Sequence, residues 1–398
     1  MKTMLDNKNA AQLRHVAGAW WVGGIALCLF LLMPASSLKA ATTGVQPHIR
    51  SFSPGKFIER GSGSLEIMIR GTNFRSGIRA YVGNVRATRV IRYGTTSLKI
   101  TVPRGTLAEG RYSLVVRNAN GLGERRKLAI RIVAPHLATA GDIAVCGSTH
   151  TADEATATLL DAFTGSILTL GDNAYPTGHT NDFAQCYGPS WGRHLSRTIP
   201  VLGNHEYQTP NATGHFSYFG SRAGDPTKGY FARTVGDWRV VVINSNCGEI
   251  GGCGTDSAQG QWLAAELRDN ATRCTIAAMH HPRFSTSLHG NNAFMDDIWK
   301  ILVANQVDVV LAGHDHNYQR FDPMDAAGSE VSSGPRLFVV GTGGADLYDF
   351  FSSNSAIAVR DNSSHGYLDM TLHPASYSWK FMSVPGDTLA DSGTGNCN

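Results

Sequence analysis

Beyond its first forty or so residues, the chain has no apolar stretch long enough to cross a membrane, and it contains no sequence repeats or low-complexity tracts. No pair of cysteines has the spacing of a zinc finger, which argues against a metal site built from thiolates. These absences argue against a multi-span membrane protein, a repeat protein and a small zinc-stabilised domain. What remains is a globular chain of 398 residues, which is long enough for two domains.

The beginning of the chain has the pattern of a secretory signal peptide. Lys2, Lys8 and Arg14 precede a largely apolar run from about Val16 to Met33, and small residues follow this run. This order predicts a signal peptide over residues 1–41, and therefore a secreted or periplasmic protein with no transmembrane span after cleavage. Because the apolar run is close in length to the thickness of a bilayer, an uncleaved membrane anchor is the alternative.

Six of the seven cysteines lie after the apolar leader. An even number of cysteines in an exported chain favours disulfide bonds, but six cysteines allow fifteen pairings and the sequence does not choose among them. Cys247 and Cys253 flank a glycine-rich loop, so we take them as the first candidates for a local bridge.

Two parts with different patterns meet near Val133-Ala134-Pro135-His136. Before this point, short β-rich runs alternate with Gly, Asn and Pro without a helical period, which predicts an antiparallel β-sandwich over residues 45–133. After it, short apolar runs such as Asp142–Val145 alternate with helical segments such as Ala258–Arg268. This alternation predicts mixed β-sheets flanked by helices over residues 136–398. The expected fold class is α/β, preceded by an all-β sandwich.

The two parts carry opposite charge. Residues 45–133 contain 17 Lys and Arg against 4 Asp and Glu, a net charge of +13, whereas the residues after them contain 14 basic and 26 acidic side chains. One interpretation is that the sandwich binds an acidic polymer: envelope glycan, lipid headgroup or nucleic acid. The alternatives are that it docks on its acidic neighbour, or that its surface is only solvated. Few aromatic residues interleave with the arginines, so we expect no specific nucleic-acid recognition.

Three sequence segments of the expected sandwich resemble the Ig-like IPT/TIG domain family. They are Ile69-Arg70-Gly71-Thr72-Asn73-Phe74, Leu98-Lys99-Ile100-Thr101-Val102-Pro103 and Gly110-Arg111-Tyr112-Ser113-Leu114-Val115-Val116. The resemblance covers about Pro47 to Val133. It implies a fold and no activity, since such domains often serve as spacers or binding modules.

Five short segments of the second part each place a metal-ligating side chain beside a glycine or at an expected strand end. They are Gly141-Asp142, Gly171-Asp172-Asn173-Ala174-Tyr175, Gly203-Asn204-His205-Glu206, Met279-His280-His281-Pro282 and Gly313-His314-Asp315-His316. Together they supply carboxylate, amide, imidazole and phenol donors, enough for two adjacent cations, and a phenolate favours a hard ion such as Fe³⁺. Adjacent residues point oppositely on an extended chain, so we expect His280, and not His281, to be a ligand.

This series resembles the metallophosphoesterase superfamily and, within it, the purple acid phosphatases. The broader superfamily has a His two places after the first Asp and a second Asp at the position of Tyr175. This chain lacks both, as purple acid phosphatases do. It departs from the family pattern at Ala144, which replaces a glycine, and we expect this change to be tolerated because that residue's side chain is not a ligand. The resemblance covers roughly residues 141–344.

The resemblance implies a binuclear metal centre of Fe³⁺ with Fe²⁺, Zn²⁺ or Mn²⁺. The ligands that it assigns are Asp142, Tyr175 and His316 for the ferric ion, Asn204, His280 and His314 for the second ion, and Asp172 as the bridge. It also implies that His205 binds phosphate or acts as an acid. His289, nine places after His280, lies where the family has a histidine that protonates the leaving alkoxide.

These features predict an exported phosphatase that hydrolyses small phosphomonoesters by attack of a metal-bound hydroxide. An alternative enzyme is a phosphodiesterase that acts on nucleotides or phospholipid headgroups with the same site. An alternative outside the enzymes is an adhesion or polymer-binding protein whose function lies in the basic sandwich. The complete ligand set favours an enzyme, because a decayed enzyme is expected to have lost at least one ligand.

Overall fold

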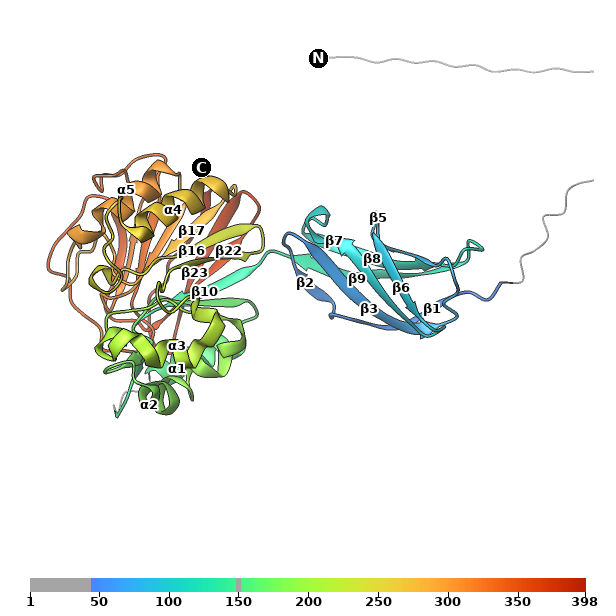
Figure 1. Cartoon of the computed structure of the whole chain (residues 1–398), viewed down its shortest axis with the longest axis horizontal. Helices are drawn as coiled ribbons and strands as arrows, with labels where there is room; N and C mark the ends of the chain where they lie inside the picture. Colours follow the sequence, from blue (N-terminus) through green and yellow to red (C-terminus); the bar gives the residue numbers. More distant parts are fainter. Residues whose placement is uncertain (1–43, 148–151) are drawn as a thin grey trace, which may run out of the picture. The chain divides into compact units, whose positions relative to one another are not determined.

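The computed structural model describes residues 44–147 and 152–398, so the predicted signal peptide, residues 1–41, lies outside the described residues. The described residues form an all-β part over residues 48–133 and an α/β part from residue 136 onward (Figure 1). No helix among them is long and apolar enough to cross a membrane.

The first part is a sandwich of two sheets. Their strand orders are β1-β3-β7-β6 and β2-β9-β8-β4-β5. The strands are β1 His48–Ser53, β2 Phe57–Glu59, β3 Ser64–Thr72, β4 Arg79–Val82, β5 Val85–Arg86, β6 Arg89–Tyr93, β7 Ser97–Pro103, β8 Gly110–Arg117 and β9 Gly123–Val133. Alternate residues such as Ile67 and Ile69 are buried between the sheets. The expected antiparallel pairing is correct except at one edge, where β2 runs parallel to β9.

The second part contains a six-stranded sheet of order β14-β12-β10-β22-β23-β24 and a seven-stranded sheet of order β15-β16-β17-β18-β20-β19-β21. The strands are β10 His136–Ala140, β11 Ala144–Val145, β12 Ser166–Thr169, β13 Ala174–Tyr175, β14 Thr198–Ile199, β15 Phe231–Val235, β16 Trp238–Val242, β17 Thr275–Ala278, β18 Val309–Ala312, β19 Tyr318–Phe321, β20 Arg336–Val340, β21 Ile357–Asp361, β22 Gly366–Leu372, β23 Ser376–Ser383 and β24 Ser392–Asn396. Parallel strands form the β10–β12–β14 and β16–β17–β18–β20 groups, and antiparallel strands flank them, so both sheets are mixed as the sequence predicts.

The seven-stranded sheet is buried on both faces. On β16, Val240 and Val242 belong to a core shared with the six-stranded sheet, whereas Val241, and Ile243 just after the strand, belong to a second core. Helices α4 (Ala258–Asp269) and α5 (Asp296–Ala304) close this second core (Figure 1). Helices α1 (Ala152–Asp161) and α3 (Thr213–Phe219) pack against the first core, and the short α2 spans Thr180–Asp182. The fold is therefore two mixed sheets flanked by helices.

One expected strand is only partly correct. In the run Asp142–Val145, only Ala144 and Val145 form a strand, β11, because the preceding strand ends at Ala140 and Asp142 has a φ of 60°. The chain turns there, and pairing resumes only at Ala144. The expected helix Ala258–Arg268 is confirmed as α4, whose first turn is capped by the side chain of Ser257 accepting from the backbone N–H of Gly260.

Three disulfide bonds are present. They join Cys146 to Cys186, Cys247 to Cys253 and Cys274 to Cys397. The expected local bridge between Cys247 and Cys253 is confirmed. The third bond ties the end of the chain to the beginning of β17, and crosslinks of this length remove conformational entropy from the unfolded chain.

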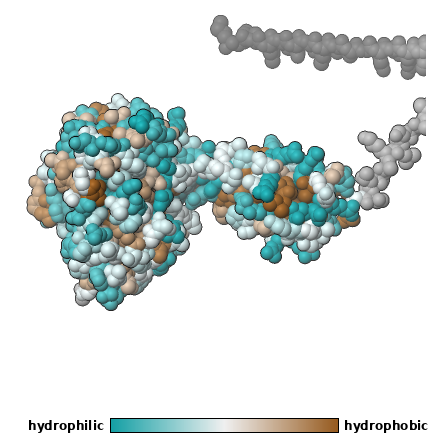
Figure 2. All heavy atoms as spheres, in the orientation of Figure 1, coloured by the Kyte–Doolittle hydropathy of each residue, from teal (hydrophilic) through white to brown (hydrophobic). Residues whose placement is uncertain are grey.

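Hydrophobic residues on the displayed face form small patches between hydrophilic ones (Figure 2). Among the described residues, the large apolar side chains that remain exposed are Val45, Phe57, Tyr93, Leu128, Val145, Leu288, Phe294 and Phe351. Leu288 directly precedes His289, and Phe294 contacts the ring of His281. Exposed apolar side chains beside polar site residues are a common feature of ligand-binding grooves.

Candidate metal centre

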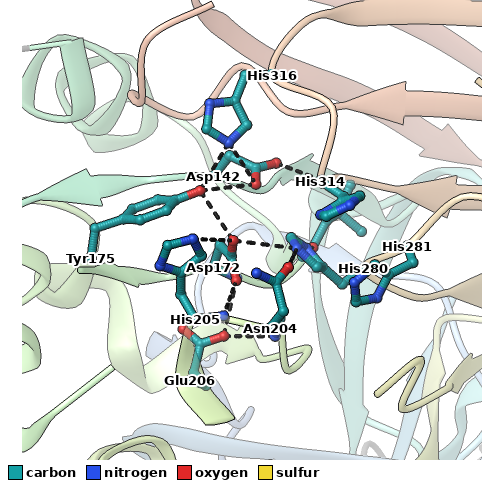
Figure 3. A network of polar contacts seen from close by, with 12 residues as sticks. Asp142, Asp172, Tyr175, Asn204, His205, Glu206, His280, His281, His314 and His316 are labelled. Carbon is teal, nitrogen blue, oxygen red and sulfur yellow. Dashed lines mark hydrogen bonds and ion pairs between the residues drawn. The ribbon is translucent and has the colours of Figure 1, made fainter. Parts of the chain in front are cut away.

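The candidate ligands lie after the carboxyl ends of parallel strands in both sheets. Asp142 and Asp172 follow β10 and β12 of one sheet, and His280 and His314 follow β17 and β18 of the other. Asn204 follows β14, and Tyr175 ends β13. The structure brings all seven predicted metal ligands together at this edge of the two sheets, and Figure 3 shows them converging on a shared space.

The phenol of Tyr175 lies at the centre of the first group of ligands. Its oxygen is 3.1 Å from Oδ1 of Asp142, 3.2 Å from Oδ2 of Asp172 and 3.0 Å from Nε2 of His316. Burial, together with the charges of Asp172 and Asp142, raises the pKa of Tyr175 well above its ordinary value. A cation at this position would offset both carboxylates and favour the phenolate.

The second group of ligands gathers around His280. Nε2 of His280 is 3.0 Å from Oδ1 of Asn204 and 3.4 Å from Oδ2 of Asp172, and its ring centroid is 5.0 Å from that of His314. Burial alone would lower the pKa of His280, but the carboxylates of Asp172 and Asp142 raise it to about 9. Oδ2 of Asp172 thus contacts both groups, which is the position that a bridging ligand requires (Figure 3).

Backbone groups orient the ligand side chains. Nδ1 of His280 donates to the carbonyl oxygen of Leu170 at 2.7 Å, and Nδ1 of His316 donates to that of Asp346 at 2.8 Å. Each of these bonds turns the Nε2 atom of its histidine toward the centre, as in many protein metal sites.

Three of the ligands have left-handed backbone conformations. The φ angles are 60° at Asp142, 46° at Asp172 and 72° at His314. Such angles are uncommon outside glycine, and they concentrate at functional sites. The adjacent glycines are needed for close packing: a Cβ atom at Gly171 would lie 2.5 Å from Nδ1 of His280, and one at Gly313 would lie 2.7 Å from Oδ2 of Asp142.

Sequence reasoning missed the role of Glu206. This fully buried carboxylate accepts hydrogen bonds from the backbone N–H groups of Gly203 (2.6 Å), Asn173 (2.7 Å) and Asp172 (3.1 Å). Burial raises its pKa to about 7. Glu206 therefore joins the loops that carry Asp172 and Asn204. The signal was an acidic residue inside a ligand segment, but its partners are backbone groups that the sequence does not identify.

His281 lies closer to the centre than its place next to His280 suggested. Ligating nitrogen atoms of His280, His281 and His314 lie within 4.8 Å of one another. The chain bends at residues 280 and 281, so the two adjacent rings do not point apart as they would on a strand. Nδ1 of His281 is 2.8 Å from the hydroxyl of Ser245, which fixes the orientation of this ring.

The two predicted substrate-side histidines border the ligand groups. Nε2 of His205 is 3.8 Å from Oδ2 of Asp172, and its Nδ1 is 2.5 Å from the carbonyl oxygen of Pro176. The ring of His289 stacks on His314 with centroids 4.1 Å apart, and its Nδ1 is 3.0 Å from Oδ1 of Asp315. Both histidines therefore lie next to the space between the two ligand groups.

The side chains present fit a pair of cations. Asp142 and Asp172 are buried, and an ionic carboxylate in that environment requires a positive partner. Ligating atoms of Asp142, Asp172 and His280 lie within 4.8 Å of one another. The donors are oxygen and imidazole nitrogen, without thiolates, a set that suits hard and borderline ions such as iron, manganese and zinc.

Comparisons with known proteins agree with this geometry. Residues 141–318 match the family model of calcineurin-like phosphoesterases, and residues 47–126 match that of the IPT/TIG domain. Purple acid phosphatase 21 of Arabidopsis thaliana is 30% identical to this chain over 56% of this chain and 55% of its own length. An uncharacterized protein of Mycobacterium tuberculosis is 28% identical over 32% of this chain and 28% of its own length.

A solved structure shows the same fold. The purple acid phosphatase isolated from yellow lupin seeds matches 88% of this chain and 74% of its own, with a TM-score of 0.55 and 15% identity. The chain spans between 28% and 55% of the length of the curated relatives it matches.

Residues 141–318 therefore carry the sequence signature of the calcineurin-like phosphoesterases on the metallophosphoesterase fold, and the candidate ligands lie at the strand ends of this part. Within that superfamily the chain is purple acid phosphatase-like, and it carries an N-terminal TIG domain. Both resemblances inferred from the sequence are confirmed, as is the fold class.

Proposed function

We propose that this chain is an exported, binuclear metal-dependent phosphatase that hydrolyses phosphomonoesters. The observation that carries the proposal is the position of Asp172, whose Oδ2 lies between Tyr175 and His280 and so joins two complete ligand groups. The family implies a binuclear centre, and the buried donors of this chain suit one.

The ligand geometry suggests how the cations would be held. Fe³⁺ would be held by Asp142, Tyr175 and His316. The second ion, Fe²⁺, Zn²⁺ or Mn²⁺, would be held by Asn204, His280 and His314. Asp172 would be a ligand of both ions. When bound, the two ions supply Lewis acidity toward the phosphate oxygens and an activated water.

Two histidines would act on the substrate. His205, beside Asp172, would donate a hydrogen bond to a phosphate oxygen. His289 would give a proton to the departing alkoxide from Nε2, because its Nδ1 is engaged by Asp315.

A single preparation of the purified protein tests this proposal. We expect two metal ions per chain, iron among them, and a visible absorption band from the iron–tyrosinate pair. Hydrolysis of p-nitrophenyl phosphate should disappear on chelation and return on adding the metals back. A colourless, iron-free protein that is fully active would contradict the assignment of Fe³⁺, and a metal-loaded protein without turnover would contradict the phosphatase assignment.

A phosphodiesterase that uses the same ligands is the second enzyme candidate. The rates of hydrolysis of p-nitrophenyl phosphate and bis(p-nitrophenyl) phosphate distinguish a monoesterase from a phosphodiesterase. These two substrates share a leaving group and differ only in the second ester. We expect the monoester to be hydrolysed faster. A faster diester reaction would replace the monoesterase by a phosphodiesterase.

Export is proposed from the leader and the cysteines. All six cysteines after the leader form disulfide bonds, which persist in oxidising compartments. Fractionation of cells that express the whole chain, followed by N-terminal sequencing of the mature protein, tests this. Cytoplasmic protein that retains residues 1–41 would contradict export.

A proposal for the TIG domain is that it binds an acidic envelope polymer. On the sheet containing β4 and β8, Arg79 lies directly opposite Arg117, and an adjacent row contains Arg86, Tyr81 and Arg125. All four arginines are exposed, and none has an ion pair with a described acidic residue. Like charges directly opposite each other destabilise a sheet, so a bound anionic partner would reduce the electrostatic repulsion between these arginines.

A charge-reversed pair of variants tests the polymer proposal. The double variant Arg117→Glu with Arg125→Glu should lose binding to alginate at least about tenfold. The control, Arg70→Glu with Arg89→Glu on the other sheet, changes the net charge equally and should retain most of the binding. Equal losses would show that only net charge matters, and no binding by the unaltered chain would reject the proposal.

A further inference from the structure

A groove with two cavities leads away from the candidate metal centre. The first cavity, of about 500 Å³, begins at Asn204 and His281 and has Phe294 in its wall. The second, of about 620 Å³, is lined by polar side chains together with Phe216, Pro226 and Ile250. The two cavities share Tyr207 and Glu249, so these two residues border the passage between them.

Hydrogen bonds and a disulfide hold this passage in place. The fully buried Asn244 donates from Nδ2 to the phenol oxygen of Tyr207 at 2.8 Å. Its Oδ1 accepts from the backbone N–H and the side-chain amide of Asn246 at 3.1 and 3.0 Å. The bond between Cys247 and Cys253 closes the loop that carries Glu249. The two walls are therefore fixed before any ligand arrives, which reduces the entropy cost of binding.

Away from the candidate metal centre, Glu249 is the only Asp, Glu, Lys or Arg among the described residues that line the groove. No lysine or arginine is among the described residues that line either cavity, and Glu249 is exposed without an ion-pair partner among the described residues. Lys228, next to the lining residue Thr227, lies 3.6 Å from a carboxylate oxygen of Asp225. A second phosphate that reached the passage between the two cavities would therefore lie beside a carboxylate, without a lysine or arginine among the lining residues.

Aromatic side chains give the groove flat apolar walls. Phe294 is 50% exposed, and its ring packs edge-on against His281 with centroids 5.5 Å apart. Tyr207 and Phe216 extend the aromatic surface into the second cavity. Exposed aromatic surface of this kind is stabilised by covering it with a ligand of similar shape.

We propose that this groove binds an extended leaving group that carries a positive charge, with its apolar part against Phe294 and Tyr207 and the positive group at Glu249. The inference rests on the proposed phosphatase function and specifies its substrate class. It disfavours nucleoside polyphosphates and inositol polyphosphates. In the reaction, water forms a bond to phosphorus, the bond from phosphorus to the leaving-group oxygen breaks, and that oxygen takes a proton as it departs.

Matched phosphopeptides test the proposal on the full chain loaded with metal. Three peptides share one phosphotyrosine and differ only in a neighbouring Lys, Gln or Glu. We expect kcat/KM to be roughly three- to tenfold higher for the Lys peptide than for the Glu peptide, a size consistent with replacing an attractive exposed charge pair by a repulsive one. In Glu249→Gln the ratio should approach one, and in Glu249→Lys it should reverse. The matched control is Glu330→Lys, because Glu330 is exposed and lines neither cavity.

A ratio that is unchanged in Glu249→Lys, or that changes equally in Glu330→Lys, would overturn the proposal. Phe294→Ala supplies a second readout: KM should rise several-fold for the peptides and stay constant for glycerol phosphate, and equal effects on both would overturn the role of the aromatic wall. Isothermal titration of the same peptides distinguishes a failure of the groove proposal from a failure of the phosphatase assignment. Charge-selective binding without turnover would contradict the phosphatase assignment alone, whereas turnover without charge selectivity would contradict the groove proposal alone.

Discussion

Oδ2 of Asp172 lies 3.2 Å from the phenol oxygen of Tyr175. The same carboxylate oxygen is 3.4 Å from Nε2 of His280, which belongs to the other ligand group. Asp172 also has a left-handed backbone, and its N–H donates to the buried Glu206. Its position is therefore fixed from both sides, by the ligands it contacts and by the loop that holds it.

Replacing Asp172 by Asn should remove the negative charge shared by the two ligand groups. We expect kcat to fall at least about a hundredfold, because losses of tenfold to a hundredfold already follow from changes to residues that only support metal ligands. The measurement is hydrolysis of p-nitrophenyl phosphate together with metal analysis. Asp225→Asn is the control, since Asp225 is exposed and lines no part of the centre. Unchanged turnover in Asp172→Asn would contradict the whole site.

Replacing Tyr175 by Phe should preserve the packing of the ring and remove only the donor oxygen. The phenol oxygen contacts Asp142, Asp172 and His316, so its loss should weaken the binding of Fe³⁺ and abolish the visible absorption band. Absorption spectra and iron content at equal protein concentration check this. A band that survives in Tyr175→Phe would show that another side chain supplies the colour.

The sequence predicted the ligand set because ligands and glycines occur together in short segments, such as Gly313-His314-Asp315-His316. It also predicted the second sheet and the helix α4, because their periodicity is local. It could not place Glu206, since the partners of this carboxylate are backbone N–H groups from three different loop positions. The start of the run Asp142–Val145 was misjudged because a left-handed turn at Asp142 overrides the apolar pattern.

The contact between His289 and Asp315 predicts a dependence on the leaving group. Nδ1 of His289 is held by Asp315, so Nε2 is left to protonate a departing oxygen. His289→Asn should therefore reduce kcat by about a hundredfold or more for an alkyl phosphate, whose leaving group needs the proton. The loss for p-nitrophenyl phosphate, whose leaving group departs as an anion, should be much smaller. Equal losses for both substrates would assign His289 to phosphate binding instead.

The variant Asp315→Asn tests whether Asp315 acts by positioning the ring of His289, which itself would donate the proton. The Asn side chain can still accept a hydrogen bond from Nδ1 of His289 but carries no charge. We expect a smaller loss than in His289→Asn, again larger for the alkyl phosphate than for p-nitrophenyl phosphate. A loss that is independent of the leaving group would indicate a general disturbance of the neighbouring ligands His314 and His316.

His215 predicts how the stability of the fold depends on pH. Its side chain is 1% exposed, packs against Phe183, Phe216 and Phe219, and has a buried Nδ1 without a hydrogen-bond partner. Burial lowers the pKa of His215 from 6.5 to about 3. Above pH 6.5 the imidazole is neutral in both states, so its contribution to stability is fully present there. As the pH falls below 6.5, the unfolded chain takes up a proton that the folded chain does not.

The free energy of unfolding should therefore fall by up to about 1.4 kcal/mol per pH unit from this residue below pH 6.5, and the loss should continue until about pH 3. His215→Phe removes the titrating group and keeps an aromatic ring, so its stability should change less between pH 7.5 and pH 5. Urea unfolding at the two pH values measures this difference, in which any constant effect of the substitution on packing cancels. An equally steep pH dependence in His215→Phe would mean that other groups cause the loss of stability in acid.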